Sequence, residues 1–281
     1  MTAPYVMETA RATVRMVGRV ATVQAHEVAL LASTAAMTPI RLVFGGFHSE
    51  SSSSPHMKAH AAPTARPVVL IHGFGGTNAS WCVIAQALRD RGVTIDTMTY
   101  PPLGSSVEQL ADQLASAVKR ILSQTGAEKV HLVGHSLGGV VIAQAIAGGG
   151  LDGVVDTVVT LGSPFGGSPW ADVLPINDIV RALRPGSPLL SRLASAPIPI
   201  DIRWLAVTAA LDVIVPGRRS VPSHAGVETI TVNGVGHLGM LESRRVVDCI
   251  LDALPTHGSA KASTRPMRRL PAPAGHGALA S

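Results

Sequence analysis

Six short runs of apolar and β-branched residues are spaced along the middle of the chain. They cover residues 67–71, 93–98, 129–134, 155–162, 202–209 and 227–233. Runs that are apolar toward both faces are typical of strands buried on both sides of a parallel sheet. The pattern therefore predicts six strands.

Helical patterns alternate with these strands. They lie at about residues 79–91, 106–125, 137–147 and 240–254. Strands that alternate with helices form a parallel sheet with helices packed on both of its faces. The sequence therefore predicts an α/β fold with a mostly parallel central sheet, over residues 67–254.

The first 48 residues carry a different pattern. Small apolar residues from Val6 to Leu31 recur at intervals that place them on one stripe, and Arg11, Arg15 and Arg19 fall on the opposite side. This pattern predicts an amphipathic helix with a basic face, which suits a membrane surface. It suits equally a partner helix or a groove on the protein's own body.

This amphipathic segment gives little sign of a transmembrane helix or a signal peptide. Its longest uncharged stretch is shorter than the roughly 20 residues that cross a bilayer. Its charges alternate with the apolar stripe instead of preceding a compact apolar core. We therefore expect a cytoplasmic or peripherally membrane-associated protein, with possible membrane contact through residues 1–47.

Two segments without periodicity flank the predicted domain. Residues 49–66 are rich in Ser, Ala and Pro, which indicates a flexible linker. Residues 255–281 are basic and rich in Pro, Ala and Gly, which indicates a disordered tail. The predicted organisation is a helical segment over 1–48, this linker, one domain over 67–254 and this tail.

The chain has a formal net charge of +5, but its excess basic residues lie near its ends. Nucleic-acid binding would favour a basic patch with aromatic residues on the folded body, so no nucleic-acid partner is expected. Cys82 and Cys249 make no metal-binding pattern, and two free thiols are favoured over a pair. No cluster of metal-ligand spacing is present, so we expect neither a metal nor a cofactor.

The sequence Gly-His-Ser-Leu-Gly joins a predicted strand to a predicted helix at residues 134–138. A turn this tight strains its central residue, Ser136, and needs glycine where the backbones approach closely. It lifts the Ser136 hydroxyl above the sheet, where the Leu137 amide would face a forming oxyanion. These features predict a nucleophile at Ser136, and a chance serine in a turn is the alternative.

A serine nucleophile needs a base, and the base needs a group that orients it. His237 lies in a glycine-rich loop between the last strand and the last helix, which predicts the base. Asp212 follows the strand at 202–209, at the carboxyl edge of the sheet where such sites assemble. The competing residues lie in strands, in the turn itself, in an insertion or at other edges: His131, His135, His224, Asp156, Asp178 and Asp201.

A second oxyanion donor is expected in the loop after the first strand. This loop reads His-Gly-Phe-Gly-Gly over residues 72–76, and its glycines let a backbone amide face the site. Phe74 is the predicted donor. The same glycines could also serve only to turn the chain.

Five motifs in order, LIHGFGG, VGHSLGG, LGSPFGG, ALDVIVP and VNGVGHLGML, resemble those of α/β-hydrolase lipases and esterases. The chain is most similar to the compact bacterial triacylglycerol lipases, over about residues 67–254. This resemblance implies a triad of Ser136, Asp212 and His237, with an oxyanion hole formed by the amides of Phe74 and Leu137.

The segment 168–199 departs from the smallest of these lipases. Its apolar residues are Trp170, Ile176, Ile179, Leu183, Leu189, Leu190 and Leu193. Because it follows the strand at 155–162, it would lie over the site as a small helical cap. An apolar cap suits a hydrocarbon chain, although the same residues could instead belong to the core.

These observations together predict a serine hydrolase of carboxylic esters that works through an acyl-enzyme on a lipid or other acyl-chain ester. A thioesterase or an acyltransferase would use the same triad. The alternative from another class is a non-catalytic, membrane-associated lipid-binding protein.

Overall fold

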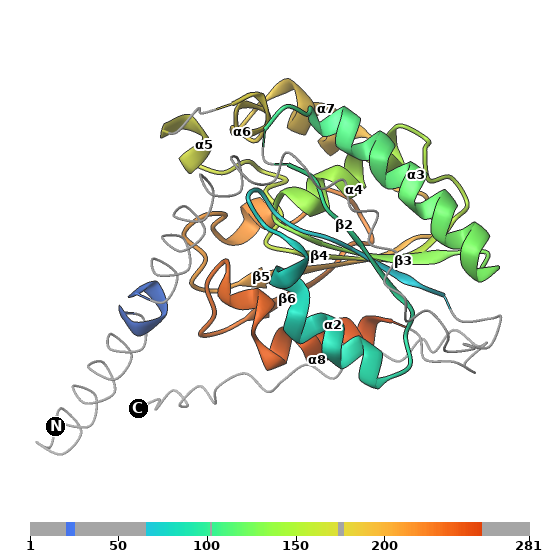
Figure 1. Ribbon diagram of the computed structural model, residues 1–281. Coiled ribbons are helices and arrows are strands. Elements are labelled where there is room, and N and C mark those ends of the chain that lie inside the picture. The colour runs from blue at the N-terminus through green and yellow to red at the C-terminus, as the bar shows by residue number, and fades with distance from the viewer. Residues whose placement is uncertain (1–20, 26–65, 102, 174–176, 255–281) are drawn as a thin grey trace, which may run out of the picture.

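The computed structural model describes residues 21–25, 66–101, 103–173 and 177–254. Its centre is a six-stranded parallel sheet with the strand order β2-β1-β3-β4-β5-β6 (Figure 1). The strands are β1 (Val68–Ile71), β2 (Ile95–Met98), β3 (Val130–His135), β4 (Val155–Leu161), β5 (Arg203–Ala209) and β6 (Glu228–Val232). The predicted α/β fold with a parallel central sheet is confirmed.

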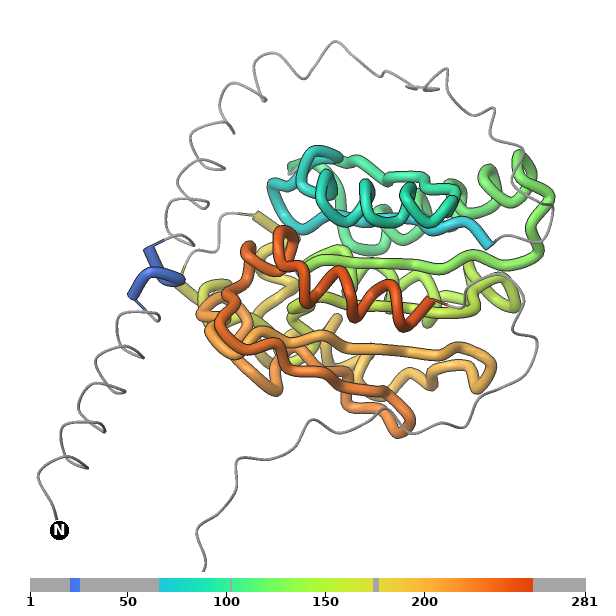
Figure 2. Tube along the Cα trace, turned by 90° about the horizontal axis from the view of Figure 1, so that it is seen from below, coloured from blue at the N-terminus to red at the C-terminus, as the bar shows by residue number. Residues whose placement is uncertain are grey.

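Helices cover both faces of the sheet. On one face lie α2 (Cys82–Asp90) and α8 (Arg244–Ala253), which run in front of the strands when seen from below (Figure 2). The other face carries α3 (Val107–Thr125), α4 (Leu137–Ala147), α5 (Trp170–Val173), α6 (Asp178–Ala182) and α7 (Pro188–Ser195) (Figure 1). Short 3₁₀ helices lie at Asn78–Trp81, Gly217–Ser220 and Gly239–Leu241.

The two faces of the sheet build two apolar cores. In β1, Val69 and Ile71 join the core under α3 and α4, whereas Val68 and Leu70 join the core under α2 and α8. All four side chains are fully buried. Successive residues of a strand point to opposite faces, so a strand covered on both sides must be apolar throughout.

The segment 168–199 contributes to the core on the α3 and α4 side. Ile179, Leu183, Leu189, Leu190 and Leu193 are buried there. By contrast, the side chain of Trp170 remains about half exposed. Ile176 lies outside the described residues. The bounds of a cap over 168–199 remain a prediction.

Only a short piece of the predicted N-terminal helix belongs to the described residues. Residues 21–25 are helical, and the Gln24 side-chain amide donates a hydrogen bond to the Leu211 carbonyl at 3.0 Å. The rest of the predicted segment 1–48, the linker up to residue 65 and the tail 255–281 lie outside the described part. Within that part, no helix combines the length and apolar character needed to cross a membrane. Cys82 and Cys249 are free thiols, as predicted.

The first turn of α4 packs directly against the carboxyl end of β1. A Cβ atom at Gly138 would lie 2.1 Å from the Ile71 carbonyl oxygen, a backbone atom that has no flexible end to move aside. We expect Gly138→Ala to lower the free energy of unfolding by about 3 kcal/mol or more, because the added methyl overpacks a rigid contact. Urea unfolding followed by circular dichroism measures this loss.

A matched control lies at the other end of the same helix. A Cβ atom at Gly148 would meet only Gln144 and Ala145 carbonyl oxygens, the nearer at 3.2 Å, and the position is exposed. Gly148→Ala is expected to change the free energy of unfolding by no more than about 0.5 kcal/mol. Equal losses in the two variants would contradict the proposed contact.

Candidate active site

Ser136 occupies a strained turn between β3 and α4. Its φ is 52° and its ψ is −121°, and it is the sole non-glycine residue with a positive φ among the residues described. Such a conformation costs on the order of 1–3 kcal/mol and persists only where the surroundings enforce it. Here the Ser136 amide donates to the Leu161 carbonyl at 2.9 Å, and Gly139 donates to the Ser136 carbonyl at 3.1 Å.

The turn has no room for side chains at its neighbours. A Cβ atom at Gly134 would lie 2.6 Å from the Gly139 nitrogen. At Gly73, in the loop after β1, a Cβ atom would lie 2.9 Å from the Ser136 Cβ. The glycine-rich loop and the strained serine are therefore in direct contact.

His237 and Asp212 form a buried pair. The His237 Nδ1–H donates to Asp212 Oδ2 at 2.8 Å, and both residues are buried. The other carboxylate oxygen, Oδ1, accepts the backbone amides of Ile214 at 2.8 Å and Val215 at 2.7 Å. Since Nδ1 is held by the carboxylate, Nε2 is the ring nitrogen left to exchange a proton with a reactant.

Ser136 and His237 are not joined by a direct hydrogen bond, but the ring of His135, the residue before Ser136, lies beside the His237 ring. The His135 and His237 ring centroids are 4.8 Å apart. Within the described residues, Ser136 has no hydrogen bond to the His237 imidazole. A nucleophile–base hydrogen bond commonly tightens only when substrate binds.

The predicted oxyanion loop and Ser136 line one hollow. Its lining residues are His72, Gly73, Phe74, Gly76, Ser80, His135, Ser136, Leu238 and Leu241. The Gly76 amide donates to the Gly73 carbonyl at 3.0 Å and closes a turn around Phe74. Leu137 is the first residue of α4, so its amide belongs to the helix N-terminus beside Ser136.

His72 and Tyr100 fix the base of this loop. The His72 Nδ1–H donates to the Gly73 carbonyl at 2.8 Å, and its ring stacks on Tyr100 with centroids 4.2 Å apart. The Tyr100 hydroxyl donates in turn to the His72 carbonyl. Burial raises the pKa of Tyr100 well above its ordinary value, so the phenol keeps its proton and remains a donor. The sequence carried no local signal for this contact, because the two residues belong to different strand–loop units.

Gly162 is a further residue that sequence reasoning did not single out for the site. Its φ is 56°, and a Cβ atom there would lie 3.1 Å from both Asp212 Oδ2 and His237 Nδ1. The same atom would lie 2.5 Å from Met240 Cε. Glycine at the end of β4 therefore makes room for the Asp212–His237 pair. Its position directly after a buried apolar run was the only signal in the sequence that pointed to it.

The competing acids are engaged elsewhere. Asp156 lies 3.4 Å from Arg66 Nη1 and 3.5 Å from His131 Nδ1. Asp201 lies 2.8 Å from Lys129 Nζ, and Asp178 pairs with Arg181. None of these three carboxylates contacts His237.

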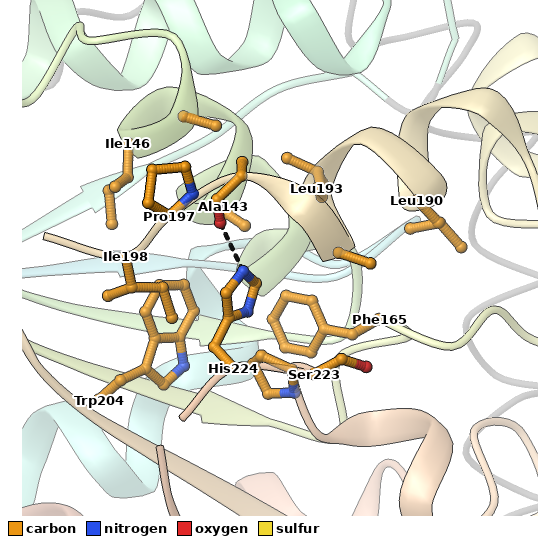
Figure 3. A pocket seen from close by; sticks show the side chains of 14 residues that line it. Ala143, Ile146, Phe165, Leu190, Leu193, Pro197, Ile198, Trp204, Ser223 and His224 are labelled. Atoms are coloured by element: carbon orange, nitrogen blue, oxygen red, sulfur yellow. Dashed lines mark hydrogen bonds between the residues drawn. The ribbon is translucent and has the colours of Figure 1, made fainter. Parts of the chain in front are cut away.

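A second hollow lies between α4, α7 and β5 (Figure 3). It is mostly apolar, with Ile146, Leu193, Phe165 and Trp204 around it. Its nearest residue on α4, Ala143, is seven positions beyond Ser136, which corresponds to about 10 Å along a helix. This hollow holds none of the predicted triad.

The part of the chain that the structure describes contains no group of three or more His, Cys, Asp or Glu side chains suitably placed for a metal ion.

Comparisons with known proteins find similarity to α/β hydrolases. Residues 68–197 match the family model described as Alpha/beta hydrolase family. The chain is 32% identical over 128 residues to a triacylglycerol lipase of Pseudarthrobacter phenanthrenivorans, and equally so to one of Burkholderia plantarii. Each match covers 43% of this chain but only 39% and 35% of the two relatives, so the chain spans well under half of their length.

A solved structure supports the fold over a larger share of the chain. The mature form of the Bacillus licheniformis lipase BlEst2 superimposes with a TM-score of 0.60 and 18% sequence identity. The match covers 69% of this chain and 94% of that lipase. At this identity the likeness shows a shared fold.

The buried histidines predict that acid destabilises the protein. Burial, and then the charge of neighbouring His237, lowers the pKa of His135 to about 3, and burial lowers that of His131 to about 4, from 6.5. Below pH 6.5 the unfolded chain therefore binds more protons, so stability present above that pH is lost as the pH falls toward the folded values. We expect a loss of about 2 kcal/mol per histidine between pH 6.5 and about pH 5.

Urea unfolding at the two pH values measures this loss. His131→Gln, which removes one titrating group far from Ser136, is expected to lose less stability than the wild type over the same interval. An equal loss in both proteins would show that His131 does not titrate as its burial requires.

Proposed function

Because the chain has the α/β-hydrolase fold, we propose that it is a serine hydrolase of carboxylic esters that works through an acyl-enzyme. The observation that carries this proposal is the buried hydrogen bond of 2.8 Å between His237 and Asp212, beside the strained turn of Ser136. The similarity to two proteins named triacylglycerol lipase supports the same class of reaction.

In the proposed first half-reaction, Ser136 Oγ attacks the ester carbonyl while His237 Nε2 takes the hydroxyl proton. The tetrahedral intermediate collapses as His237 returns that proton to the leaving alcohol, and the acyl group remains on Ser136. In the second half-reaction, water gives its proton to His237 and attacks the acyl carbon. The carboxylic acid leaves, and Ser136 regains its proton.

Asp212 has the role of orienting the imidazole and stabilising its protonated form. Its Oδ2 accepts the His237 proton at Nδ1, while the amides of Ile214 and Val215 hold Oδ1. Two backbone donors on one oxygen fix the position of the carboxylate. The imidazole is thereby held in the tautomer that presents Nε2 to the serine.

The proposed oxyanion hole consists of the backbone amides of Phe74 and Leu137. The first lies in the turn closed by Gly73 and Gly76, and the second lies at the N-terminus of α4. Donors already in place where negative charge develops are worth about 3 kcal/mol each.

The surroundings of the site favour an acyl-chain substrate. Phe74, Leu238 and Leu241 line the hollow beside Ser136. Trp170 donates from its indole nitrogen to the Val213 carbonyl at 2.9 Å, and both side chains stay partly exposed next to the Asp212 loop. Apolar side chains in the wall of a site and near its acid suit a hydrocarbon chain.

A fluorophosphonate probe tests the nucleophile. We expect the probe to label the wild type and to lose all labelling in Ser136→Ala, because only an activated serine displaces fluoride from phosphorus. Mass spectrometry of the labelled peptide locates the adduct. Ser80→Ala, in the same hollow, is the control and should keep its label. A folded wild type that takes no label would refute the proposal.

The role of Asp212 is tested by Asp212→Asn, which keeps the size of the side chain and removes its charge. We expect kcat for p-nitrophenyl ester hydrolysis to fall about 10³- to 10⁴-fold, because the imidazole loses its tautomer and the stabilisation of its charged form. The control, Asp201→Asn, breaks an exposed ion pair with Lys129 and should leave kcat unchanged. A small effect at Asp212 would assign the acid elsewhere.

A further inference from the structure

His135 lies where three loops of the site meet. It is the last residue of β3, immediately before Ser136, and it is 3% exposed. Its Nε2 lies 3.1 Å from the carbonyl oxygen of His237, a residue 102 positions away along the chain. On its other side, a Cβ atom at Gly73 would lie 3.0 Å from His135 Nδ1. The ring therefore touches the loop that carries the imidazole and the loop that carries the Phe74 amide.

The hydrogen bond to His237 fixes the state of the His135 ring. A carbonyl oxygen only accepts, so Nε2 must carry the proton and donate it. His135 is hydrogen-bonded to the main chain of His237, whereas Asp212 is hydrogen-bonded to the side chain of the same residue. Two independent contacts therefore define where the His237 ring lies.

The His135 ring stays uncharged while its neighbour cycles between charged and neutral forms. Burial, followed by the charge of His237, lowers the pKa of His135 to about 3. A positive charge at this ring, with centroids only 4.8 Å apart, would oppose proton uptake by His237. A neutral donor holds the loop without this repulsion.

We infer that His135 is a positioning residue, which holds the His237 loop against the nucleophile turn through its Nε2–H hydrogen bond to the His237 carbonyl. This inference rests on the proposed function, because it assigns to His135 the alignment of the proposed base with Ser136. His135 itself makes no contact with the reacting atoms in this role.

Two substitutions separate the hydrogen bond from the bulk of the ring. His135→Phe keeps a flat ring and loses the donor, whereas His135→Gln places an amide N–H near the position of Nε2. For His135→Phe we expect kcat on a p-nitrophenyl ester to fall about tenfold to a hundredfold with KM within about twofold, because small misplacements of a catalytic group cost rate. His135→Gln should restore kcat to within about threefold of the wild type.

The chain provides a matched control in His224. Its Nε2–H donates to the Ala196 carbonyl in the same way, in the apolar hollow away from Ser136 (Figure 3). His224→Phe should leave kcat within about twofold of the wild type. Thermal unfolding of all variants shows whether a lost activity reflects lost folding.

The outcomes separate this inference from the proposed function. A wild type that neither hydrolyses the ester nor takes the fluorophosphonate label refutes the function. Two results with an active wild type would refute the positioning role alone. In the first, His135→Phe is as active as the wild type. In the second, His135→Gln folds but is as impaired as His135→Phe. If neither variant folds, nitrogen-15 NMR of the wild-type histidines decides. An Nε2–H tautomer at His135 supports the role, and an Nδ1–H tautomer overturns it.

Discussion

The contact between the start of α4 and the carboxyl end of β1 is the constraint on which the rest of the site depends. Gly138 rests against the Ile71 carbonyl, and Gly139 faces Ser163, with no space at either position for a Cβ atom. Ser136, the residue directly before this helix, has a positive φ. Favourable packing in the two apolar cores offsets the free-energy cost of this strained conformation.

A parallel sheet brings the remaining groups to the same edge. The loops after β1, β3, β5 and β6 supply Phe74, Ser136, Asp212 and His237 in turn, because every strand ends on the same side. Hydrogen bonds between loops then set the geometry within that edge. The His237 loop is tied to Asp212 through its ring and to His135 through its main chain.

The sequence predicted the fold well because the fold depends on local patterns. Continuous apolar runs located all six strands, and the helix expected at 137–147 has those bounds in the structure. The order of the loops pointed to Asp212 and His237, which the structure pairs. The sequence did not reveal the contact of Gly162 with Asp212 and His237, or the contact of Tyr100 with His72. These contacts join segments that are far apart in the sequence, and the spacing of apolar residues does not show which distant segments meet. The spacing of apolar residues also could not show whether the leucines of 168–199 belong to a cap or to the core, because a buried helix face has the same pattern in both.

The lack of free space around Ser136 also shapes how such a protein can change over generations. A turn that admits no extra carbon at Gly73, Gly134 or Gly138 leaves few neighbouring positions where mutation can adjust reactivity. Replacement is easier where side chains are exposed, as at Trp170 and Val213. Sequence change is therefore expected to accumulate at this surface and to spare the turn around Ser136.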